Sequence, residues 1–135
     1  MISALVPTGT SGAVNITFNS SGAGYYRPRI AVYAVTNLQS TTPYDLQITT
    51  GTPTGAPKTF TGNQVKDGVL FFGSTVCGNS TTRTMSGIST DFSVSPVSLV
   101  QYIGGADATS TTGTTSITVT GGTSGQWAAI VAAFR

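Results

Sequence analysis

The sequence predicts an all-β fold, an antiparallel β-sandwich of jelly-roll type with about eight or nine short strands. Three observations across the 135 residues carry this prediction. Short runs rich in β-branched and aromatic residues recur along the chain, turn-forming residues separate them, and no segment has the length and spacing of a typical helix. One domain spanning residues 1–135 accommodates all of the strands. The pattern alone does not separate a sandwich from a closed barrel.

The N-terminal third contains three predicted strands. Residues 14–18 alternate apolar and polar side chains, the period expected when one face of a strand is buried. Residues 29–38, RIAVYAVTNL, are apolar on both alternations, which predicts a central strand covered on two sides. Residues 44–48 alternate again and precede a turn signal, GTP, at residues 51–53, which predicts a third strand.

The middle of the chain predicts one strong strand and several weaker ones. A short strand is expected at residues 59–61 and a turn at residues 63–68. The apolar run of residues 69–77 is too short for a typical helix and rich in strand-forming residues, so it is predicted to be a core strand. Further short strands are predicted at residues 82–85, 92–94 and 98–103, and the glycine pair at residues 104–105 is expected to end the last of them.

Two complementary runs near the C-terminus predict an antiparallel hairpin. Residues 116–120 and 127–134 flank a glycine-rich loop at residues 121–125. The final run, WAAIVAAF, is rich in alanine, which is the strongest intrinsic helix former. Eight residues without a cap, directly after a glycine-rich loop, nevertheless favour a strand, and its alanines would allow a neighbouring sheet to approach closely.

The low charge of the chain limits its partners. Charged residues make up 7% of the sequence and the formal net charge is +2, against about 25% charged residues in average soluble domains. The basic residues are scattered apart from Arg27 and Arg29, so no basic stripe of the kind that nucleic-acid binders use is present. The first residues lack the regions of a signal peptide, and no stretch is long enough to span a bilayer. We therefore expect a protein made in the cytoplasm that binds neither nucleic acid nor membrane.

Side chains suited to catalysis are scarce. The chain has no histidine and no glutamate, and its acids are Asp45, Asp67, Asp91 and Asp107. General acid–base catalysis and metal binding draw mainly on histidine, cysteine and carboxylates. We therefore expect no catalytic site, cofactor or metal, and we expect the aspartates in turns and at strand ends. The alternative, two aspartates that converge in the fold as in a glycosidase, stays open.

The densest cluster of interface-type residues is Tyr25, Tyr26, Arg27 and Arg29. Tyrosine and arginine combine a large contact area with polar tips, and both are enriched at protein interfaces. We take this cluster as the candidate interface. The alternative is that the tyrosines cover the edge of the core while the arginines are solvated.

Two single residues have alternative roles. Trp127 stands at the head of a predicted core strand, which favours packing over a sugar-stacking platform. Cys77 is the one cysteine of the chain, and it is predicted to be a small buried hydrophobic residue. An intermolecular disulfide through Cys77 is the alternative.

Several segments together resemble a known group of proteins. They are SITVTGGTSGQWAAIVAAFR at residues 116–135, ITF at 16–18, RIAVYAV with the Ser/Thr-rich loop after it, GVLFF at 68–72 and TDF at 90–92. This combination resembles the small β-sandwich proteins of tailed-bacteriophage virions, which also occur among prophage-derived bacterial proteins. The resemblance covers most of the chain. It implies a non-enzymatic role in assembly on capsids, collars, tails or fibres, with no catalytic residues to carry over.

Composition and resemblance together give one expectation for function. We expect a virion structural protein, such as a capsid decoration, collar or tail-associated subunit, that contacts other virion proteins and forms homo-oligomers. The methionine at position 1 favours a stand-alone accessory subunit. The alternative is a carbohydrate-binding or adhesin module that uses Tyr25, Tyr26 or Trp127 to stack on sugars.

Overall fold

The chain is all-β, as the sequence predicts. A computed structural model describes residues 15, 30–51, 57–77, 83–97, 100–120 and 126–135. These residues form eight strands and no helix. The strands are β1 (Asp45–Gly51), β2 (Lys58–Gln64), β3 (Val69–Cys77), β4 (Thr84–Ser86), β5 (Phe92–Val97), β6 (Val100–Ala108), β7 (Gly113–Thr120) and β8 (Gln126–Phe134).

The strands form two antiparallel sheets with the wrapping order of a jelly roll. The larger sheet has the order β1-β8-β3-β6-β5 and the smaller one has the order β2-β7-β4. Strand β1 pairs with β8, β2 with β7 and β3 with β6, so early strands meet late ones in a nested sequence. This nesting is typical of double-sheet jelly rolls. Strand β5 joins the larger sheet through β6 instead of pairing with β4.

The main core lies between the two sheets. Leu70 on β3, Ile103 on β6 and Ile117 on β7 are its largest fully buried side chains. Each belongs to the face of its strand that points into the sandwich, where alternate side chains from both sheets meet. The sheets approach each other closely at Gly62 on β2, where an added Cβ would lie 2.8 Å from side-chain atoms of Leu70 and Val131.

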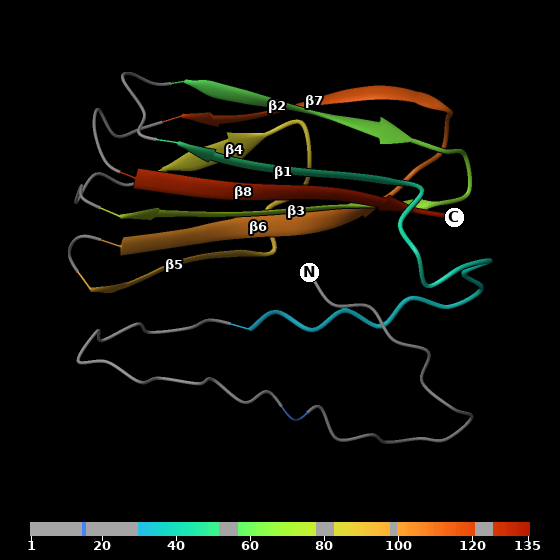
Figure 1. The fold of residues 1–135 in the computed structure, drawn as a ribbon, viewed down its shortest axis with the longest axis horizontal. Helices are drawn as coiled ribbons and strands as arrows, with labels where there is room; N and C mark the ends of the chain where they lie inside the picture. Colours follow the sequence, from blue (N-terminus) through green and yellow to red (C-terminus); the bar gives the residue numbers. More distant parts are fainter. Residues whose placement is uncertain (1–14, 16–29, 52–56, 78–82, 98–99, 121–125) are drawn as a thin grey trace.

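An extended segment, residues 30–39, forms a third layer, which we call the covering segment. It runs along the larger sheet on the side away from the smaller sheet (Figure 1). The ring of Tyr33 contacts the ring of Phe71 on β3, with centroids 5.2 Å apart. The backbone N–H of Gln39 donates to the carbonyl of Arg135 over 2.7 Å, which ties the end of the segment to the C-terminal residue.

The predicted central strand at residues 29–38 is wrong for its described residues, 30–38. None of them is in a strand, and Ile30 and Val32 are exposed. Tyr33 and Leu38 pack on the outside of the sheet, while Ile30, Val32 and Val35 stay exposed. The apolar pattern of this segment therefore marks neither a strand nor a segment covered on two sides.

Two further expectations are corrected. The C-terminal hairpin does not form, because β7 pairs with β2 and β4 while β8 pairs with β1 and β3, in different sheets. The glycine pair at residues 104–105 does not end its strand, since β6 continues to Ala108. A Cβ at position 105 would collide with the carbonyl oxygen of Ser89, so glycine here permits close approach of two backbone segments.

Several expectations are confirmed. The run at residues 69–77 is strand β3, residues 127–134 belong to strand β8 and not to a helix, and residues 45–48 belong to β1. The turn before β3 contains Asp67 with φ of 61°, a conformation that asparagine and aspartate adopt more readily than most residues. The strand predicted at residues 14–18 lies outside the described residues except for position 15.

Candidate interaction surface

The larger sheet has a second apolar face, which we call the outer face because it points away from the smaller sheet. Residues directly opposite each other in an antiparallel pair share one face. Phe71 on β3 lies opposite Ala132 on β8 and Ala106 on β6, and Ala132 lies opposite Leu46 on β1. The outer face therefore continues across four strands without a charged side chain in this row.

Aromatic packing covers the centre of the outer face. Phe71 and Phe134 are buried, and their rings meet edge to face with centroids 5.7 Å apart. The ring of Tyr33, in the covering segment, packs against the ring of Phe71 with an angle of 68° between the ring planes. Ala132 is fully buried beneath these rings, and Leu38 and Val69 pack at their margin. The centre is thus a second, smaller core.

The margin formed by β1 remains uncovered. Tyr44, just before β1, is 63% exposed, and Leu46 and Ile48 on β1 are 49% and 68% exposed. Leu46 and Ile48 lie opposite Ala132 and Ile130, so both belong to the outer face. These three apolar side chains follow one another along the edge of the sheet, where the outer face carries no charge among the described residues. They form a candidate contact surface.

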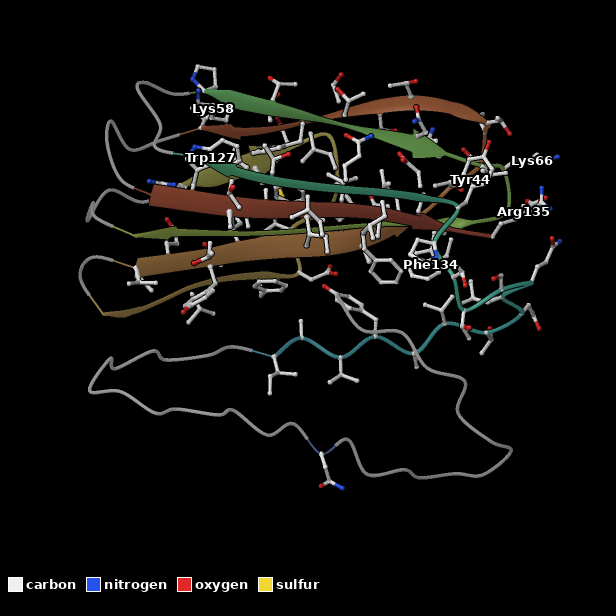
Figure 2. The ribbon with its side chains drawn as sticks, viewed as in Figure 1. Tyr44, Lys58, Lys66, Trp127, Phe134 and Arg135 are labelled. Carbon is white, nitrogen blue, oxygen red and sulfur yellow. The ribbon has the colours of Figure 1, made fainter. Side chains whose placement is uncertain are left out.

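A cavity lies at one end of the outer face, beside the covering segment. Its volume is about 650 Å³, and Val69, Phe71 and Ala106 contribute to its apolar wall. Lys66 and Arg135 also line it, and Figure 2 shows both at the end of the sandwich that also holds Tyr44. The Nε of Arg135 donates to the side-chain oxygen of Gln39 over 2.9 Å, so this cation is held in place.

Tyr33 is also fixed by its hydroxyl. Burial, followed by a hydrogen bond to Asp91 and the charge of that carboxylate, raises the pKa of Tyr33 to about 12. The phenol therefore stays protonated at neutral pH and donates to Asp91. Asp91 also accepts from the backbone N–H of Ala106 over 3.0 Å, which links the covering segment to strand β6.

Arg83 is the one buried cation among the described residues. It lies just before β4, and its backbone N–H donates to the side-chain oxygen of Gln101 over 3.1 Å. Gln101 in turn donates to the hydroxyl of Ser93 over 2.9 Å. Burial lowers the pKa of the Arg83 guanidinium. This group lies away from the outer face, because Gln101 belongs to the inner alternation of β6.

The aspartates occupy the structural positions that the sequence predicts. Asp45 accepts from the backbone N–H of Asn63, and Asp107 accepts from the backbone N–H of Ser89, both over 3.0 Å. Asp91 accepts from Ala106, and Asp67 holds the turn before β3. In the described part of the chain, no three residues among histidine, cysteine, aspartate and glutamate gather as a metal site would require.

Two further predictions concern the candidate interface cluster and Trp127. The cluster of Tyr25, Tyr26, Arg27 and Arg29 lies outside the described residues. Trp127 packs against the main core, as predicted, with its ring edge to face on Phe60 at a centroid distance of 5.3 Å. Figure 2 shows it at the end of the sandwich opposite Arg135.

The position of Cys77 is described only through its backbone. It ends β3, opposite Val100 and Gln126. Its side chain lies outside the described part of the structure, so the expected burial and the alternative disulfide stay predictions.

Sequence reasoning did not identify the outer face as a site. The alternation of Tyr44, Leu46 and Ile48 predicted a face buried in a core, whereas the structure leaves it exposed. The signal that could have revealed it is the apolar character of both alternations in β3 and β8. A strand with two apolar faces needs cover on both, and one face of a two-sheet sandwich points outward.

Comparisons with family models, with curated proteins and with solved structures found no match. Among the described residues, no helix is long and apolar enough to cross a membrane.

Proposed function

We propose that this chain is a non-enzymatic structural subunit of a tailed-bacteriophage virion that acts through protein–protein contacts. The observation that carries the proposal is the uncovered apolar margin at Tyr44, Leu46 and Ile48, because a row of exposed apolar side chains on a rigid sheet is suited to a permanent neighbour. A capsid decoration, collar or tail-associated position would each supply such a neighbour.

Three further features support this proposal. The jelly-roll fold serves in viral capsid proteins, although it also serves in lectins, so the fold alone does not decide between them. The chain carries few charges, and its surface would hold a partner by shape and apolar contact with little dependence on salt. Asp45, Asp91 and Asp107 each accept a hydrogen bond from a backbone N–H, which gives these three carboxylates structural roles.

The structure weakens one route to sugar binding. A stacking platform must present the face of an aromatic ring to solvent. Trp127 instead packs on Phe60 and the main core. An aromatic sugar platform would therefore have to come from tyrosines, such as Tyr25 and Tyr26, instead of Trp127.

Mass spectrometry and electron microscopy of purified particles test the proposal. We expect the chain in mature particles at a copy number that matches a symmetric position, and we expect it to stay attached in high salt. A glycan array with the purified chain provides the contrasting measurement. Absence from particles together with reproducible glycan binding would replace the structural role with an adhesin role.

A further inference from the structure

We infer that the edge of β1, which pairs with no second strand among the described residues, binds β1 of a second copy of this chain, so that two larger sheets join into one continuous antiparallel sheet. The inference deepens the proposed function, because it names one partner of the same apolar surface. It rests on that function only for its biological purpose. The pairing itself is a property of the purified chain.

The four edge strands of the described sheets differ in how they are protected. Strand β5 contains Pro96, which has no N–H to donate, and its register with β6 shifts between Val94 and Val97. Strand β4 has three residues, too few to guide a long pairing. Strand β2 begins with Lys58, a residue type that discourages strand addition. Three of the four edges thus carry a recognised obstacle.

Strand β1 carries none of these obstacles. Its seven residues, Asp45–Gly51, pair with β8 in one unbroken register. It contains no proline and no lysine, and its single charge, Asp45, stands at its start. A regular edge of this length, with its one charge at the first residue, offers backbone N–H and C=O groups to another strand.

The sequence of β1 suits pairing with itself. An antiparallel pair centred on Ile48 aligns all seven residues of β1 with the same seven residues of the second copy. Asp45 then lies opposite Gly51 of the second copy, so no carboxylate faces another. Gln47 lies opposite Thr49 of the second copy, which places polar beside polar on the inner alternation.

The outer face gains from the same alignment. Ile48 lies opposite Ile48 of the second copy and opposite Ile130 of its own β8, so the apolar row continues across the junction. Leu46 lies next to this row and loses part of its exposure. The pairing is isologous, so it closes after two copies and leaves no β1 edge for further addition. A second copy therefore fits this edge without leading to open-ended growth.

Analytical ultracentrifugation of Ile48→Lys tests the pairing. Ile48 is 68% exposed, so a lysine there is compatible with the folded monomer. In the dimer two ammonium groups would face each other in place of two apolar side chains, and we expect the dimer to weaken by about tenfold or more. Val32→Lys is the matched control, since Val32 is 70% exposed but lies in the covering segment. We expect Val32→Lys to keep the wild-type dimer.

Disulfide trapping tests the register independently of the lysine variant. In a Cys77→Ser background, Ile48→Cys places two thiols on directly opposite residues, whose Cα atoms are roughly 4.5–5.5 Å apart in an antiparallel pair. This spacing suits a disulfide. Thr50→Cys is the control on the same face, because the two Thr50 residues stand several residues apart in this alignment. We expect rapid covalent dimers from Ile48→Cys and few from Thr50→Cys.

Other results would overturn the inference. A wild-type chain that stays monomeric at high concentration, or equal cross-linking of both cysteine variants, excludes this pairing. Hydrogen exchange distinguishes the remaining occupants of the edge. Protection, in a monomer, of the β1 amides that point away from β8 would assign the edge to another segment of the same chain, such as residues 14–18. Absence of the chain from virions, by contrast, would remove the proposed function and leave the dimer intact.

Discussion

Truncation of Phe71 tests the claim that the centre of the larger sheet is buried on both faces. Phe71→Ala removes a ring that is buried on the outer face and that contacts the rings of Tyr33 and Phe134. Truncation of a buried phenylalanine lowers the free energy of unfolding by about 3–5 kcal/mol. This loss is a large part of the roughly 5–15 kcal/mol that stabilises a typical domain. We expect a value near the lower end, because Tyr33 leaves one side of the contact partly open to solvent.

Urea unfolding followed by circular dichroism provides the measurement. Val94→Ala is the control, since Val94 is exposed at the margin of the same sheet and its truncation should change stability by no more than about 0.5 kcal/mol. A double-mutant cycle between Tyr33→Ala and Phe71→Ala should give a coupling energy of about 1 kcal/mol for the edge-to-face pair. A loss below about 1 kcal/mol for Phe71→Ala, or no coupling, would refute the second core.

Two other predictions concern the covering segment and the glycines of β6 and β7. The raised pKa of Tyr33 means that the unfolded chain loses this proton first as pH rises, so stability should fall between the ordinary tyrosine pKa and about 12. The loss should be about 1 kcal/mol or less, because Tyr33 is 38% exposed. In an absorbance titration, Tyr33→Phe should lack a phenol that ionises near pH 12 in the wild-type chain. Gly105→Ala should lower stability by about 1–3 kcal/mol, because its Cβ meets the Ser89 carbonyl. At Gly113 an added Cβ has no atom within 4 Å, so Gly113→Ala should leave the stability unchanged or raise it by about 0.5 kcal/mol. Thermal melts that rank the two variants equally would contradict this.

The sequence predicts the fold class because the two-residue period is local. Residues of β1 alternate between apolar and polar whatever their partners are, β3 is a short run rich in strand-forming residues, and turn residues mark the ends of several strands. The jelly-roll class followed from strand number and the absence of helices. The pairing of individual strands did not follow, because β7 and β8 are adjacent in sequence yet lie in different sheets. A glycine-rich loop that can close a hairpin can also cross from one sheet to the other.

The surface was harder to predict than the fold. Leu46 and Ile48 have the pattern of a buried strand face, and only the position of β1 at the edge of the sheet leaves them exposed. Residues 30–38 also have the apolar pattern of a covered strand, yet only Tyr33 and Leu38 pack on the sheet, and Ile30, Val32 and Val35 are exposed. The apolar pattern of a strand is a local property of the sequence. Whether that strand lies at the edge or in the centre of a sheet depends on contacts between distant segments.

Hydroxyl-radical footprinting of the chain, free and in assembled particles, tests most directly whether the β1 margin is the contact surface. We expect Tyr44, Leu46 and Ile48 to react in the dilute free chain, in accordance with their exposure, and to be protected in particles. Val32, exposed in the covering segment, reports whether protection is confined to β1. Equal reactivity of the β1 residues in both states would contradict the account.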